Sequence, residues 1–246
     1  KALVEGARVL NYFAGLQMDR AAHHPDETER RKGADLLAIL TPVVKAFLTD
    51  SALEVTSLGI QVHGGHGYIR ETGVEQYLRD ARIAAIYEGT NGVQAADLLG
   101  RKVLGSGGQL ARLLGGLIGA FCQRHAGYEE LADFVPRLTG LLKEWSEMTE
   151  RLAARIARDP DELGAAAVDY LNFTGYLCYA WCWAKMAAVA STALQRGTTE
   201  RAFYEAKLTT ARFFYQRLLP RAEAHLDATG GGAADVMKLT PDQFAF

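Results

Sequence analysis

Residues 61–68 read Gln-Val-His-Gly-Gly-His-Gly-Tyr and end a long apolar helical pattern at two adjacent glycines, Gly64 and Gly65. Because glycine has no Cβ, the backbone can turn left-handed there and a ligand can touch the main chain directly. Gly64 is well placed as the left-handed residue that terminates the preceding helix. The stretch therefore predicts a helix end that also offers bare backbone to a bound cofactor.

Further along, residues 86–91 read Ile-Tyr-Glu-Gly-Thr-Asn and place one carboxylate, Glu88, at the junction of two helical patterns. A lone acid near a close-approach loop suggests a cofactor site with a general base. The plainer alternative is that Glu88 is a solvated or capping glutamate and that the glycine pair is only a helix cap. Spacing alone supports a helical protein with a possible ligand loop and nothing more specific.

The composition restricts the class of protein. Of the 246 residues, 49% are hydrophobic and 23% are charged, and the formal net charge is −2. This balance is ordinary for a globular protein and gives no electrostatic footprint for nucleic acid or an anionic membrane surface. Six prolines and almost no strand-like alternation predict an all-α chain.

The cysteines and histidines do not form a recognisable metal motif. Cys122, Cys178 and Cys182 are too few and too scattered for a disulfide framework, which favours a reducing cytoplasm. Cys178 and Cys182 lie one helical turn apart without further ligands nearby in sequence, so buried packing is favoured over a metal site. His63 and His66 share no regular helix face, and we expect no metal there either.

Hydrophobic periodicity predicts helices in the first part of the chain. The first covers 2–23, and the charged residues 26–34 are expected to form a solvated loop. A second helical run follows from Asp35, with Pro42 either at the first turn of a new helix or at a kink. Its apolar residues form one predicted buried stripe, made of Val44, Phe47, Leu48, Val55, Leu58 and Val62. Residues 71–79, with Val74, Tyr77 and Leu78 inward, and residues 93–103 are predicted as two further helices.

A glycine-rich segment at 105–108 predicts a boundary between two regions, 1–104 and 105–246. Beyond it, helical patterns cover 109–124, 129–158, 160–196 and 199–228. Short connections between long helices favour antiparallel packing, with the aromatic-rich helix 160–196 at the centre. Its apolar run contains Lys185 and is interpreted as a core helix, so no membrane span is expected. The chain starts inside a helical pattern at Lys1 without a methionine, as expected of a piece of a longer protein.

Three motifs in a fixed order give the chain a resemblance to a known family. They are residues 61–68, the Arg-Asp-Ala-Arg of 79–82, and residues 86–91. Together, within residues 36–103, they resemble the second half of the carboxy-terminal helical domain of the acyl-CoA dehydrogenases, flavoenzymes that desaturate acyl-CoA thioesters. Residues 104–246 are similar to the additional helical region of long bacterial members, a subgroup that includes methylthiopropanoyl-CoA dehydrogenases. The resemblance thus implies part of a four-helix domain followed by an extra helical bundle.

The resemblance implies a role for each matched residue. Glu88 matches the base that removes an α-proton while the β-hydrogen leaves as hydride to flavin N5, and its backbone N–H is placed against the thioester oxygen. Tyr87 and Gly89 match the wall of the acyl-CoA site. The residues that match FAD contacts are Gln61, Gly64, Gly65 and Thr90, the first three commonly serving the neighbouring subunit. Arg79 and Asp80 are expected to hold their short helix in place.

The chain also departs from the family pattern. Many relatives carry a glutamine or an acid where this chain has Gly92, and Asn91 or the backbone is expected to replace that FAD contact. The family's amino-terminal helical domain, its middle β-domain and the first helix of its carboxy-terminal domain have no counterpart in the sequence. We therefore expect this chain alone to retain no FAD and to be catalytically silent.

For the intact enzyme, the resemblance implies α,β-dehydrogenation of an acyl-CoA, electron transfer to electron-transfer flavoprotein, a homodimer and a cytoplasmic location. One alternative is an acyl-CoA oxidase on the same scaffold, which also uses a glutamate base. A nitroalkane oxidase is disfavoured because it is expected to carry aspartate at position 88. The other alternative is a non-catalytic helical interaction module that retains the motifs.

Overall fold

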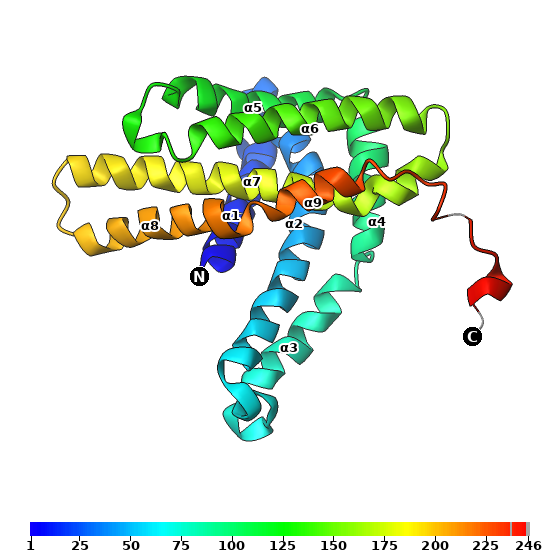
Figure 1. Ribbon diagram of the computed structural model, residues 1–246. Coiled ribbons are helices and arrows are strands. Elements are labelled where there is room, and N and C mark those ends of the chain that lie inside the picture. The colour runs from blue at the N-terminus through cyan, green and yellow to red at the C-terminus, as the bar shows by residue number, and fades with distance from the viewer. Residues whose placement is uncertain (237, 245–246) are drawn as a thin grey trace.

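The computed structural model describes residues 1–236 and 238–244, and within these the chain is all-α, with no β-strand. Figure 1 shows a stack of long helices from which α2 and α3 project as a hairpin. The elements are α1 (Ala2–His23), α2 (Glu27–Val62), η1 (Gly64–Tyr68), η2 (Arg70–Thr72), α3 (Val74–Arg82), η3 (Ile83–Ala85), α4 (Asn91–Ala96), η4 (Asp97–Leu104), α5 (Gln109–His125), η5 (Glu129–Leu131), α6 (Val135–Ile156), α7 (Asp161–Gln195), α8 (Arg201–Phe213), η6 (Phe214–Leu218), α9 (Arg221–Ala228) and η7 (Pro241–Phe244).

Helix α7 is the centre of the fold, as the sequence predicts. More than half of its 35 residues are buried, including every residue from 176 to 184. A helix that is apolar on all sides needs neighbours all round, and α1, α2, α4, α6, α8 and α9 supply them. The indole rings of Trp181 and Trp183 pack near Phe13 of α1 and Phe214 of η6, respectively. The extra helices thus share one core with the amino-terminal helices.

The predicted solvated loop at 26–34 is wrong, because α2 already begins at Glu27. The carboxylate of Asp26 accepts hydrogen bonds from the backbone N–H groups of Thr28 (2.7 Å) and Glu29 (3.2 Å), which caps the helix. Gly33 is buried in the contact with α1, where a Cβ would lie 2.9 Å from the carbonyl oxygen of Gln17. The charged residues therefore form the solvent side of a helix whose glycine permits close packing.

Pro42 lies inside α2 and does not start a new helix. Of the two alternatives predicted for this proline, a position within one long helix therefore agrees with the structure. The predicted buried stripe holds only over the first part of α2. Phe47 is buried and Val44 is half-buried, whereas Leu58 is 51% exposed and Val62 is 86% exposed. The stripe leaves the core because the end of α2 extends beyond the bundle and is covered within the described chain only by the short elements of the hairpin, chiefly α3 and η1.

The end of α2, together with η1, η2, α3, η3 and the turn that follows, forms a projecting arm, residues 54–90 (Figure 1). Gly67 is its only buried residue. Gly64 has φ +59°, so the predicted left-handed helix end is confirmed. The predicted inward position of Tyr77 is wrong, because its side chain is 68% exposed, while Val74 and Leu78 are half-buried against α2.

Beyond the arm, α4 and η4 return along α2 and α7, and residues 105–108 turn into the antiparallel pair α5 and α6. The predicted helix 199–228 is divided into α8, η6 and α9, with Pro220 at the start of the last piece.

By length and composition, one helix of the described chain, α2, is apolar enough to cross a membrane. Its apolar side packs on α1, α4 and α7, as the side of a core helix does.

Candidate functional site

The turn that carries Glu88 is the most unusual backbone in the structure. Within residues 1–236 and 238–244, Glu88 is the only non-glycine residue with positive φ, at +54°, and Gly89 follows at +87°. A left-handed conformation costs a residue with a Cβ roughly 1–2 kcal/mol. Such strain persists where the surroundings hold it and is concentrated at functional sites.

Side chains of α4 hold this turn. The amide Nε2 of Gln94 donates to the carbonyl oxygen of Glu88 at 3.2 Å, and the hydroxyl of Thr90 caps α4 by accepting from the N–H of Val93 at 3.4 Å. A Cβ on Gly89 would lie 3.2 Å from the same Gln94 amide, so a small residue suits this position. The sequence reasoning missed Gln94, since one amide inside a helix carries no recognisable signal.

Glu88 lines an open groove of about 750 Å³ between α1 and α2. Its own side chain is exposed, as are those of Tyr87 and Thr90. Apolar and polar residues of α1 and α2 form the walls, and sequence reasoning did not predict any of them as site residues. The remaining lining residues are Asn11, Tyr12, Ala14, Gly15, Leu16, Met18, Asp19, Leu37, Thr41, Val44 and Lys45. A carboxylate at the edge of a mostly apolar groove is suited to proton transfer from a weakly acidic substrate.

Gln61 lies at the end of α2, Gly64 and Gly65 begin η1, and none of the three lines this groove. Helix α3, whose nine residues span about 14 Å, separates them from Glu88. All three are exposed, and no atom lies within 4 Å of a Cβ built on either glycine. The structure therefore places the predicted site residues on two separate surfaces of the chain, and both surfaces are open.

Arg79 and Asp80 each contact a neighbour within the short helix α3, which lies between these surfaces. Asp80 accepts from the amide of Gln76 at 2.6 Å, and Arg79 lies 3.9 Å from the carboxylate of Glu75. Neither Arg79 nor Asp80 lines the groove that contains Glu88. Both contacts lie within α3 itself, so the expected role of Arg79 and Asp80 in holding this helix in place stays a prediction.

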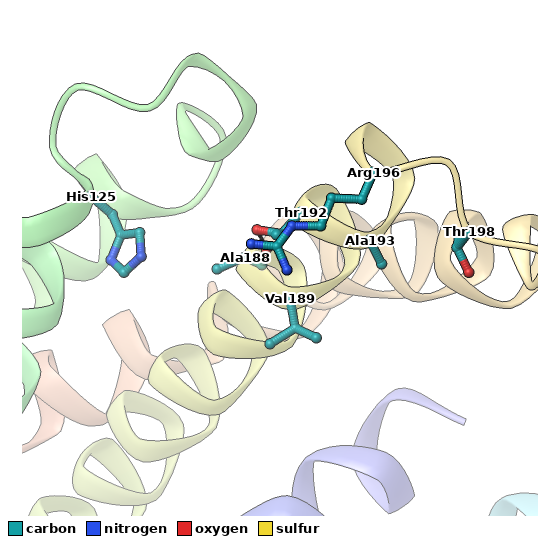
Figure 2. A pocket seen from close by; sticks show the side chains of 7 residues that line it. All are labelled: His125, Ala188, Val189, Thr192, Ala193, Arg196 and Thr198. Carbon is teal, nitrogen blue, oxygen red and sulfur yellow. Dashed lines mark hydrogen bonds between the residues drawn. The ribbon is translucent and has the colours of Figure 1, made fainter.

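A second groove, of about 500 Å³, lies between the end of α5 and the carboxy-terminal part of α7 (Figure 2). Figure 2 shows the imidazole of His125 on one side and the guanidinium of Arg196 on the other. His125 Nδ1 is bonded to the carbonyl oxygen of Phe121 at 2.9 Å. The lining contains no carboxylate or thiol, so this groove lacks the chemistry that Glu88 provides.

The buried thiols offer no competing reactive site. Cys178 and Cys182 are fully enclosed in the core, and desolvation raises the pKa of both, that of Cys182 to about 12. At neutral pH they are therefore unreactive thiols. No group of three or more metal-ligating side chains occurs in the part of the chain that the structure describes.

Comparison with protein families matches both regions of the chain. Residues 1–104 match the acyl-CoA dehydrogenase C-terminal domain, and residues 114–240 match the domain described as acetyl-CoA dehydrogenase C-terminal like. The second match alone covers more than half of the chain. Both descriptions name the same kind of enzyme.

Two curated relatives are similar over most of the chain. A 3-methylmercaptopropionyl-CoA dehydrogenase of Ruegeria pomeroyi is 40% identical over 91% of this chain and 38% of its own length. A broad-specificity linear acyl-CoA dehydrogenase of Mycobacterium tuberculosis is 32% identical over 100% of this chain and 41% of its own length. The chain thus spans about two fifths of the length of these relatives.

Solved structures show the same fold. An acyl-CoA dehydrogenase of Bacillus anthracis, complexed with FAD, matches 93% of this chain and 40% of its own with a TM-score of 0.70 at 22% identity. The ACDH-11 protein of Caenorhabditis elegans, in complex with C11-CoA, matches 96% of this chain and 38% of its own, also with a TM-score of 0.70, at 18% identity. With the two family matches and the curated relatives, this likeness shows that the chain belongs to the acyl-CoA dehydrogenase family.

Proposed function

We propose that the protein that includes this chain is an FAD-dependent acyl-CoA dehydrogenase in which Glu88 is the catalytic base. The observation that carries the proposal is the conformation of Glu88, a strained non-glycine residue at the edge of a groove of about 750 Å³. A left-handed non-glycine residue is uncommon and occurs preferentially at functional sites, which supports a role for Glu88 beyond that of a surface glutamate. The names of the relatives, all dehydrogenases of acyl-CoA thioesters, support the reaction class.

The proposed chemistry follows from the atoms of the turn. A thioester carbonyl acidifies the α-carbon, and the Glu88 carboxylate removes the α-proton. The backbone N–H of Glu88 donates no hydrogen bond within the described chain, so it is free to donate to the thioester oxygen as negative charge develops there. When bound, FAD would supply the acceptor for the hydride that leaves the β-carbon.

The open diglycine turn fits a role in FAD binding. Gly64 and Gly65 expose backbone that a Cβ would otherwise cover, and the side chain of Gln61 is exposed beside them. Thr90 would contact the cofactor beside the base. We infer, as the family resemblance implies, that the tip of the arm and the Glu88 turn each serve a different FAD in a homodimer, and their position on two surfaces separated by α3 is compatible with this. The FAD in the Bacillus anthracis structure supports the choice of cofactor.

The proposal includes an acyl-CoA substrate, electron-transfer flavoprotein as electron acceptor and a cytoplasmic location. The C11-CoA complex of the Caenorhabditis elegans structure supports the substrate class. The free, buried thiols of Cys122, Cys178 and Cys182 support a reducing compartment. We infer that this chain by itself neither retains FAD nor converts acyl-CoA, since it spans about two fifths of the length of its curated relatives.

Rapid mixing of the full-length protein with acyl-CoA under anaerobic conditions tests the proposal. We expect the flavin absorbance near 450 nm to bleach and the α,β-enoyl-CoA to form in equal amount. Failure to purify with FAD, or no bleaching with any acyl-CoA, would reject the enzyme in favour of a helical interaction module. Subsequent mixing with oxygen separates a dehydrogenase, which reoxidises slowly, from an acyl-CoA oxidase, which reoxidises rapidly.

A further inference from the structure

The side chain of Asn91 connects the segment that follows the Glu88 turn to helix α2. Asn91 is the first residue of α4, three positions after Glu88. Its amide nitrogen donates to Oδ1 of Asp50 at 2.7 Å and to Oγ1 of Thr49 at 2.9 Å. Its amide oxygen accepts from Nζ of Lys45 at 2.8 Å. The carbonyl oxygen of Ala46 also lies 3.2 Å from the amide nitrogen. All four partners belong to α2, so Asn91 joins the start of α4 to the wall of the groove.

The contacts with α2 occupy both N–H groups and the oxygen of the Asn91 side-chain amide. Both N–H bonds have acceptors on α2, and the oxygen has the Lys45 ammonium as donor. The amide of Asn91 is therefore already occupied by the protein. This arrangement disagrees with the expectation that Asn91 binds FAD in place of the side chain that many relatives carry at the position of Gly92.

The strained turn depends on this attachment. The side chain of Gln94, in α4, donates to the carbonyl oxygen of Glu88. This hydrogen bond can keep the turn in place only if α4 itself stays in place. A left-handed non-glycine residue persists only where its surroundings over-determine it. We propose that Asn91 is the positioning residue for Glu88, fixing α4 to α2 so that the carboxylate stays at the edge of the groove. The consequence for catalysis rests on the proposed function; the attachment itself does not.

Exchanging the donor and the acceptor of the 2.7 Å hydrogen bond between Asn91 and Asp50 tests the attachment of α4 to α2 in this chain. Asn91→Asp loses both N–H donors and places a carboxylate against that of Asp50, and the Lys45 ammonium, already 2.8 Å from the side-chain oxygen, can neutralise only one of the two. The double variant Asn91→Asp/Asp50→Asn restores one amide and one carboxylate with the donor reversed. We expect Asn91→Asp to speed hydrogen exchange of the hydrogen-bonded backbone amides of Val93 and Gln94 roughly tenfold or more, as local opening becomes easier, and the double variant to return towards the wild-type rate. Gln195→Ala, which removes an exposed amide bonded to Glu130, is the control. Wild-type exchange in Asn91→Asp, or no recovery in the double variant, would overturn the attachment.

The same variants test the positioning role in the full-length protein loaded with FAD. Misplacing a base lowers the rate of proton removal much more than it lowers substrate affinity, so flavin reduction by acyl-CoA should slow at least about tenfold in Asn91→Asp with the substrate Kd within about twofold. FAD content should be unchanged, and the double variant should recover most of the rate. An unchanged reduction rate, or an effect confined to Kd, would overturn the role. Normal flavin reduction in Glu88→Gln would instead reject the proposed function and leave the exchange result standing.

Discussion

The bundle around α7 and the arm at residues 54–90 have opposite relations to solvent. In α7, every residue from 176 to 184 is buried, whereas the arm has one buried residue, Gly67. Large apolar side chains on the arm are exposed, among them Val62 at 86% and Tyr68 at 81%. Exposed apolar surface of this kind marks a binding or assembly surface. The residues proposed to act on ligands are on or beside the arm, and the residues that stabilise the chain are around α7.

The largest expected difference between the two regions concerns side-chain truncation. Trp183 is fully buried in α7, and Trp183→Ala should lower the free energy of unfolding by about 3–5 kcal/mol because it leaves a large cavity. Tyr77→Ala on the arm is the matched control and should stay within about 0.5 kcal/mol. Urea denaturation followed by circular dichroism measures both. Equal losses would show that the arm is part of the same cooperative core.

Trp183→Phe sharpens this test. The Nε1 of Trp183 is buried without a hydrogen-bond partner in the described part of the chain. Phenylalanine removes that unsatisfied N–H while keeping most of the apolar volume, so the loss of stability should be under about 1.5 kcal/mol. A loss as large as that of Trp183→Ala would mean that the indole nitrogen has a partner.

The contact between α7 and the buried part of α2, from which the arm extends, should be sensitive to one added methyl group. A Cβ on Gly175 of α7 would lie 2.3 Å from the ring of Phe47 on α2. Gly175→Ala should therefore cost about 1–3 kcal/mol of unfolding free energy, and Phe47→Leu in the same chain should recover part of it. Thermal or urea unfolding measures the effect. A neutral Gly175→Ala would show that α2 moves away from α7 freely.

A smaller effect is expected at the tip of the arm, where two adjacent glycines differ in one property. A Cβ on Gly64 or on Gly65 would meet no atom within 4 Å, but only Gly64 has positive φ. Gly64→Ala should destabilise the turn by about 1 kcal/mol, and Gly65→Ala should be neutral or slightly stabilising. Hydrogen exchange of the amides at 62–68 detects both. Equal behaviour of the two variants would contradict the left-handed helix end.

The smallest effect concerns pH at the start of α2. Hydrogen bonds from the backbone N–H groups of Glu29 and Thr28 lower the pKa of Asp26 below its ordinary value of 3.8. The extra stability of the ionised cap is therefore present above that value and is lost as the pH falls through the lower, folded value. Compared with Asp26→Asn, the wild type should be the more stable at pH 7, and the difference should shrink on acidification towards pH 2. A difference independent of pH would contradict the charged cap.

Periodicity and turn chemistry predict the parts of the fold that they determine. The aromatic run of α7 indicates a helix buried on all sides, and Gly64 indicates a left-handed end. The start of α2 escapes prediction because a single capping residue, Asp26, outweighs a charged composition that is typical of loops. The prediction for Tyr77 is wrong because a helical pattern marks an apolar face and does not say whether this chain covers it.

The candidate site is predictable only in part. The motifs point to Glu88 and to Gln61, Gly64 and Gly65, but not to their separation by α3. The groove on α1 and α2 and the bonds of Asn91 come from residues about 40 to 80 positions away in sequence. Such contacts depend on the tertiary packing, so spacing along the chain does not reveal them.

Single-turnover flavin reduction in Glu88→Gln tests the central claim most directly. The full-length variant should bind FAD and acyl-CoA as the wild type does, because the amide keeps the size of the side chain. It should reduce its flavin at least about 10³-fold more slowly, because the amide cannot accept the α-proton. Reduction at the wild-type rate would contradict the assignment of Glu88 as the base.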